Sequence, residues 1–132
     1  MATLDHAHSL LRLARCDCDA LTGMQTSALF TDAIFGFHAQ QAVEKALKAW
    51  LTARRQSYPF THDLAGLLVR LEGAAADVER FWPLDRFSVY GILARYEEGD
   101  PEADVPLDRP AIVAEVAALL TYVTAVLDAA ED

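Results

Sequence analysis

Several kinds of residue are scarce in this chain of 132 residues. It has two cysteines, six glycines, five prolines and eleven basic residues, against twenty acidic residues. Two cysteines cannot form a disulfide framework, and the spacing of Cys16 and Cys18 is poorly suited to a bridge within a helix. The net charge of −9 argues against a general DNA-binding protein, which needs a basic surface to displace counterions.

Hydrophobic segments of the membrane-spanning or secretory kind are also absent from the sequence. No apolar run approaches the roughly 20 consecutive residues of a membrane span. The segment from Met1 to Asp5 has no basic stretch followed by an apolar one, so we predict no secretory signal. The expected location is the cytoplasm.

Alanine and leucine dominate what is present, and they predict helices. Hydrophobic residues make up 53% of the chain, which suits one domain, residues 1–132, with one core. Runs of β-branched residues with a period of two are absent, so the expected class is all-α. The spacing predicts an up-and-down antiparallel helical bundle of four long helices plus a shorter fifth. Their expected ranges are 5–21, 27–54, 62–71, 84–96 and, after an N-cap at Asp108, as far as Ala130. Apolar residues at helical spacing form the expected buried stripes of the first, third and fifth helices. These are Leu10, Leu13, Ala14 and Leu21 in the first, Leu64, Leu67, Leu68 and Leu71 in the third, and Ile112, Val116, Leu119, Leu120, Val123 and Leu127 in the fifth.

The predicted helix over residues 27–54 is the longest and is apolar on most of its sides. We therefore expect it to be central in the bundle or to form a subunit interface. Small residues such as Gly36 would let neighbouring helices approach closely. Gln40 lies on an apolar line of this helix, and we interpret it as a buried amide that bonds between helices.

Three segments of the chain carry a family resemblance. The first is Phe37-His-Ala-Gln-Gln-Ala-Val-Glu-Lys-Ala-Leu-Lys48, and the second is Thr61-His-Asp-Leu64. The third, Ala94-Arg-Tyr96, is followed by Glu97 at a position where proline is usual. In order and spacing these segments resemble the HEPN domain family (higher eukaryotes and prokaryotes nucleotide-binding), and the resemblance covers most of the chain.

This resemblance implies a helical bundle that forms dimers through helix faces. It also implies a separately encoded partner that resembles a minimal nucleotidyltransferase, in a toxin–antitoxin or two-part system. A groove for a nucleotide or RNA would lie among the helices, and no cofactor is expected. A plain helical interaction module without a ligand is an alternative function.

A second alternative is a metal-independent RNase toxin, because some members of the family cleave RNA with an Arg/His pair. Histidine suits the role of general base, and the arginine fork suits a phosphate. Arg55 and His62 are the only pair with the required order and gap, whereas Arg95 has no later histidine. We favour the interpretation that Arg55 is a solvated helix end and that His62 helps to cap the following helix.

The resemblance also indicates candidate contacts to nucleotide or RNA, most of them on the longest helix. The simpler interpretation is that its polar residues form one solvated face, with Glu44 and Lys48 as an ordinary i, i+4 pair. Arg95 could bind an anion with Tyr96 stacking on a base, or it could bond helix carbonyls. The candidates are His38, Gln41, Glu44, Lys45, His62, Arg95 and Tyr96.

The charges are unevenly distributed along the chain. Five acidic residues fall within residues 97–106, and four basic residues fall within residues 45–55. We therefore expect a small anionic ligand beside the long helix to be compatible with the net charge, and the acidic loop to be a surface for a basic partner. No metal site is predicted, because His6 and His8 do not share a helix face.

Overall fold

A computed structural model describes residues 2–91 and 106–131 of the chain. These residues form helices and no strands, which confirms the all-α prediction for the described part of the chain. Three α-helices are long, α3 is short, and η1 is a 3₁₀ helix. The elements are α1 (Ala2–Met24), α2 (Asp32–Ala53), α3 (Leu64–Gly73), η1 (Glu79–Tyr90) and α5 (Arg109–Glu131).

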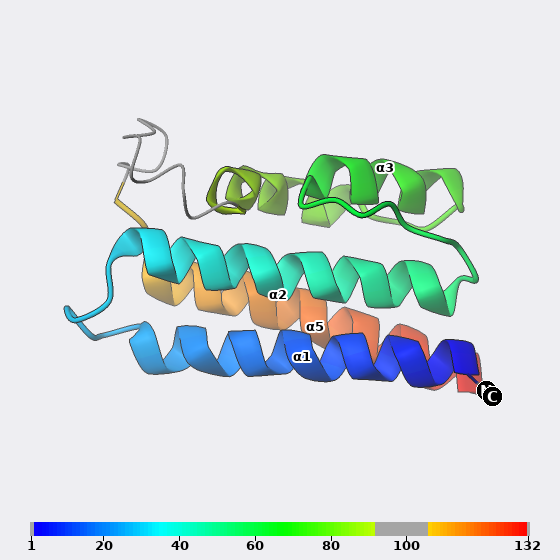
Figure 1. Ribbon diagram of the computed structural model, residues 1–132, viewed down its shortest axis with the longest axis horizontal. Coiled ribbons are helices and arrows are strands. Elements are labelled where there is room, and N and C mark those ends of the chain that lie inside the picture. Colours follow the sequence, from blue (N-terminus) through cyan, green and yellow to red (C-terminus); the bar gives the residue numbers. More distant parts are fainter. Residues whose placement is uncertain (1, 92–105, 132) are drawn as a thin grey trace.

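The helices form two layers with α2 at the centre. Helices α1 and α2 make an antiparallel hairpin with α5 beside it, while α3 and η1 cover the other side of α2 (Figure 1). Arg109 at the start of α5 bonds Asp32 at the start of α2, and His8 near the start of α1 bonds Glu131 at the end of α5. Because α2 and α5 start at the same end, these two helices run parallel rather than up and down.

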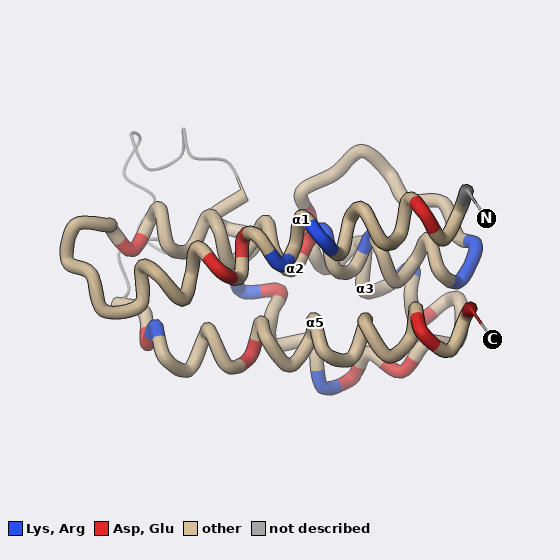
Figure 2. The backbone as a smooth tube through the Cα atoms, turned by 90° about the horizontal axis from the view of Figure 1, so that it is seen from below, with Lys and Arg blue, Asp and Glu red and all other residues tan. Residues whose placement is uncertain are grey.

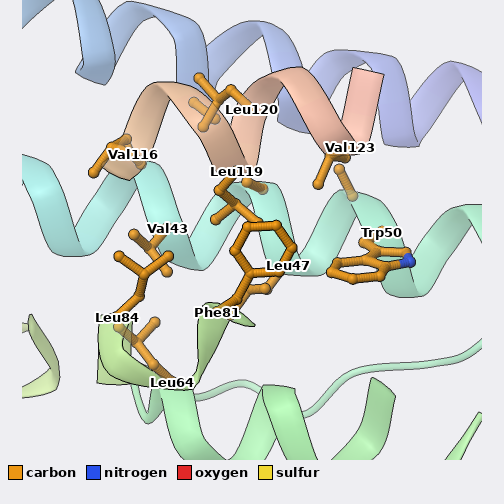
Figure 3. Packing of buried hydrophobic residues seen from close by; sticks show 14 of the residues in the cluster. Val43, Leu47, Trp50, Leu64, Phe81, Leu84, Val116, Leu119, Leu120 and Val123 are labelled. Carbon is orange, nitrogen blue, oxygen red and sulfur yellow. The ribbon is translucent and has the colours of Figure 1, made fainter. Parts of the chain in front are cut away.

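The core fills the space among α1, α2 and α5 and continues between α2 and the layer of α3 and η1. Trp50 of α2 packs edge-on against Phe81 of η1, with 5.9 Å between ring centroids (Figure 3). Every predicted apolar position of α3 and of α5 is buried. These residues are Leu64, Leu67, Leu68 and Leu71 in α3, and Ile112, Val116, Leu119, Leu120, Val123 and Leu127 in α5.

The starts and faces of two helices differ from the sequence prediction. Helix α2 begins at Asp32 rather than near Ser27, because the hydroxyl of Thr31 accepts a hydrogen bond from the Ile34 amide and caps the helix there. In α1 the buried stripe includes Leu11, whereas Leu13, which we placed on that stripe, is 51% exposed.

The predicted fourth long helix is wrong in its described part. Glu79–Tyr90 is a 3₁₀ helix that contains Pro83, where we expected an α-helix to start just after that proline. Proline lacks an N–H and clashes with the carbonyl four residues earlier, which disfavours α-helix and is compatible with i→i+3 bonding. Residues 92–96, the rest of the predicted helix, lie outside the described residues.

Arg109 ties the loop between α1 and α2 to the start of α5. Its guanidinium bonds the Asp32 carboxylate at 2.9 Å and lies over the Phe35 ring, 5.1 Å from its centroid. It also donates to three carbonyls of the loop. These are Met24 O, Ser27 O and Phe30 O. A planar fork is needed to reach acceptors in several directions.

Arg109→Lys is therefore expected to destabilise the domain. A lysine ammonium cannot reach all of these acceptors, so the free energy of unfolding should fall by about 1–2 kcal/mol in urea titrations. Arg12→Lys is the control, because Arg12 is exposed and donates to the Ser9 hydroxyl. Equal stabilities of the two variants would contradict this role of Arg109.

Although we predicted no membrane span from the sequence, α5 is the one described helix that is long and apolar enough, by length and composition, to cross a membrane. A core helix of a soluble protein passes the same test, and the buried residues of α5 pack against α1 and α2 in the bundle.

Candidate functional site

Polar side chains cover the side of α2 that faces α1 and the loop before α3. At 100° per residue they occupy an arc of about 160° of the helix. We call this surface the α2 polar stripe; it consists of His38, Gln40, Gln41, Glu44, Lys45 and Lys48. The stripe contains all the residues of α2 that the sequence indicated as nucleotide or RNA contacts.

One edge of the stripe is bound to Asp17 of α1. Lys45 Nζ donates to Asp17 Oδ2 at 2.6 Å, and His38 Nδ1 lies 2.9 Å from Asp17 Oδ1. Asp17 is only 9% exposed. Asp17 was not among the residues predicted from the sequence, although it interrupts the otherwise apolar side of α1 between Ala14 and Leu21. A carboxylate in such a position is a signal of a buried cation partner.

The other edge of the stripe is organised by Glu44, which is 5% exposed. Its carboxylate accepts hydrogen bonds from Lys48 Nζ at 3.0 Å and from Gln40 Nε2 at 2.8 Å, and lies 2.7 Å from His62 Nδ1. Burial alone would raise the pKa of this carboxyl, but the three hydrogen bonds and the lysine charge outweigh burial and lower the pKa below its ordinary value of 4.5. Glu44 is therefore ionised at neutral pH.

Gln40 joins α2 to the segment before α3. Its side chain is fully buried, and its amide donates to the His62 carbonyl at 3.2 Å as well as to Glu44. Gln41 in turn donates to Gln40 Oε1 at 2.7 Å. The prediction of a buried amide is confirmed, but outside α2 its partner is the loop before α3 rather than another helix.

Both histidines of the site contact a carboxylate through Nδ1. An ionised carboxylate only accepts hydrogen bonds, so the Nδ1 of His38 and of His62 must carry the proton. In the neutral ring, Nε2 then has a free lone pair. The His38 side chain is 33% exposed and that of His62 is 53% exposed. His62 does not cap α3, because the Leu64 amide donates to Ser88 Oγ instead.

The loop between α2 and α3 is held on the surface by polar contacts. The Tyr58 hydroxyl lies 2.7 Å from His6 Nε2, and Lys48 Nζ lies 5.2 Å from the centre of the Tyr58 ring. Four residues later, His62 is bonded to Glu44. Phe60, between these two anchors, is fully exposed.

Arg55 lies away from His62, at the end of α2. It adopts a positive φ of 59° and lines a groove of about 830 Å³ with the start of α1 and the end of α5. His62 is bonded to Glu44, which lies nine positions, or about 14 Å at the helical rise, before Ala53 at the end of α2. Within one chain the structure does not bring the Arg/His pair together.

The third motif, which contains two of the candidates, follows Gly91 in the sequence. Arg95 and Tyr96 lie outside the described residues. Gly91, the last described residue before them, packs at the Glu44 edge: a methyl group on Gly91 would lie 3.2 Å from His62 Cβ and 3.4 Å from Gln40 Nε2.

Metal-binding groups do not gather in the described part of the chain. Residues 2–91 and 106–131 contain no group of three histidine, cysteine, aspartate or glutamate side chains placed to hold a metal ion. Burial, with the nearby Asp19 charge, raises the pKa of the Cys18 thiol. His6 and His8 are bonded to Tyr58 and Glu131.

Comparison with known proteins gives one match. The family model of the HEPN domain matches residues 6–132. No curated protein and no solved structure matches the chain.

Proposed function

The chain belongs to the HEPN domain family, and from this premise we propose that it is a subunit that dimerises and partners a separately encoded nucleotidyltransferase-like protein. Membership supports a nucleotide- or RNA-related module. In the proposed system, toxin–antitoxin or two-part enzyme, the partner carries the nucleotidyl chemistry and this chain binds nucleotide or RNA beside α2.

The family match carries this proposal, and the pairing of the α2 polar stripe with two buried carboxylates indicates what this chain offers a ligand. Lys45 and Lys48 are neutralised by Asp17 and Glu44, so the motif residues act first to join α2 to α1 and to the loop before α3. Because both lysines are paired, the groups of the stripe and its loop that can hydrogen-bond a ligand are the Nε2 atoms of His38 and His62. Such a surface suits recognition more than phosphoryl chemistry, which needs charge directed at the phosphate.

Co-expression tests the partner. We expect the tagged chain to retain the product of a neighbouring reading frame for a minimal nucleotidyltransferase through affinity purification and size exclusion. Alone, the chain should elute with a mass near twice its 14.5 kDa in light scattering. The tag alone is the control. A chain that purifies without that neighbour would contradict the partnership.

A further inference from the structure

We propose that Phe60 and His62 form a reading edge for a single nucleobase, either that of a free nucleotide or an unpaired base of RNA. The base stacks on the Phe60 ring, and an N–H on its edge donates to His62 Nε2. This inference rests on the proposed nucleotide- or RNA-related function and identifies the residues that contact the base of the ligand.

Phe60 is presented to solvent in a way that core packing does not explain. Its relative exposure is 105%, although aromatic rings normally bury most of their surface. The residues two positions before and after it are fixed, Tyr58 by His6 and Lys48, and His62 by Glu44. Anchoring on both sides lowers the entropy cost of ordering the ring when a ligand stacks on it.

His62 supplies a directional acceptor close to that ring. His62 lies two positions after Phe60, so their Cα atoms are at most about 7 Å apart. Glu44 fixes the tautomer, and the Gln40 amide holds the His62 backbone carbonyl. The His62 side chain is 53% exposed, so its Nε2 lone pair has a fixed direction and would accept from the exocyclic amine of a base.

The surrounding charge favours a base over a phosphate as the recognised group. Asp63 beside His62 is exposed, and Lys48 is paired with Glu44. Figure 2 shows basic positions scattered among acidic ones along the helices. Binding by stacking and base-edge hydrogen bonds does not depend on releasing counterions, so it should depend only weakly on salt.

A nucleobase also fits this edge better than an apolar pocket of a protein. The residues that follow Phe60 are Thr61, His62 and Asp63, all polar. A protein anchor works inside an apolar patch that excludes water, whereas a base offers a stacking face and N–H donors within one ring system.

The test measures binding of a fluorescently labelled oligoadenylate of ten nucleotides by anisotropy, with AMP as an unlabelled competitor. Phe60→Leu keeps an apolar side chain but loses the stacking face, and we expect its affinity to fall about tenfold to hundredfold. Phe60→Trp should bind within about threefold of the unmodified chain. Phe30→Leu is the matched control, because Phe30 is an exposed aromatic in the other loop, 41% accessible.

A ligand change tests His62 without altering the protein. An oligonucleotide of unsubstituted purine keeps the stacking face but lacks the exocyclic amine, and should bind about fivefold more weakly. Competition by AMP at its own affinity would identify a free nucleotide as the ligand, and competition by RNA alone would identify an unpaired base.

Three outcomes would overturn the inference: unchanged affinity in Phe60→Leu, equal losses in Phe60→Leu and Phe30→Leu, or affinity that falls more than about tenfold between 50 and 200 mM salt. Loss of the co-purified partner in Phe60→Ala with unchanged RNA affinity would make Phe60 a protein anchor instead. Co-purification without RNA binding would leave the proposed partnership standing and refute only the base site.

Discussion

Gly36→Ala is expected to lower the free energy of unfolding by about 2–3 kcal/mol, because the added methyl group has no room. Gly36 is buried in α2, where the face of the Tyr90 ring of η1 lies against its backbone. A Cβ atom there would lie within 2.6 Å of Tyr90 Cγ and Cε1, a separation that real contacts do not reach. Either the ring or the whole of η1 must shift.

The same substitution at Gly23 is the control for this prediction. Gly23 lies in α1, and a Cβ atom there meets nothing within 4 Å. Alanine favours helix over glycine by about 0.5–1 kcal/mol, so Gly23→Ala should be neutral or stabilising. Urea titration of both variants gives the comparison. A loss of stability in Gly23→Ala as large as that in Gly36→Ala would show that the cost is not steric.

A double-mutant cycle assigns the cost of Gly36→Ala to the Tyr90 ring. In a Tyr90→Ala background the methyl group has space, so the further cost of Gly36→Ala should fall to less than about 1 kcal/mol. An unchanged cost in that background would place the strain elsewhere in α2.

Sequence reasoning succeeded where the information is local. The apolar spacing in α3 and α5 identified every residue that those helices bury, and the Asp108 carboxylate accepts a hydrogen bond from the Ala111 amide, as an N-cap should. Both features depend only on residues within a few positions of one another. The family resemblance rested on contiguous motifs and was likewise within reach.

It failed where a partner is distant in sequence. Asp17 is joined to residues 21 and 28 positions later, and no pattern within α1 distinguishes it from a solvated acid except its place on the apolar side. The 3₁₀ geometry of η1 was also not predicted. Apolar spacing over a short segment with an internal proline does not distinguish an α-helix from a 3₁₀ helix.

The candidate site shows the same limit. Glu44 and Lys45 are adjacent in the motif, yet on a helix consecutive side chains point about 100° apart. Lys45 therefore turns with His38 to Asp17, while Glu44 turns to His62. The angular position of a residue around the helix, rather than its place in the motif, determines which side chains lie together. The described candidates on α2 therefore form two clusters instead of one cleft.

Glu44→Ala is expected to have the largest effect of any substitution at the site. Glu44 is nearly buried and is the common acceptor of three donors. Its removal leaves the Lys48 charge and the Gln40 amide without their partner, at a cost of about 3–5 kcal/mol. Glu79→Ala, at an exposed carboxylate of η1, should change stability by less than about 0.5 kcal/mol.

The pH dependence of Glu44→Gln separates the charge of Glu44 from its packing. The folded state lowers the pKa of Glu44 below 4.5, so its carboxylate contributes stability that is fully present above pH 4.5 and is lost as the pH falls through the folded pKa. The gap in unfolding free energy between the unmodified chain and Glu44→Gln should be constant from pH 5 to 7 and should narrow progressively below pH 4.5. Measuring both chains by urea titration at each pH tests this, with Glu79→Gln as the control. A difference in unfolding free energy that stays constant down to pH 3 would show that Glu44 stabilises the fold through its shape and not its charge. An ionised Glu44 would then no longer explain why His62 carries its proton on Nδ1.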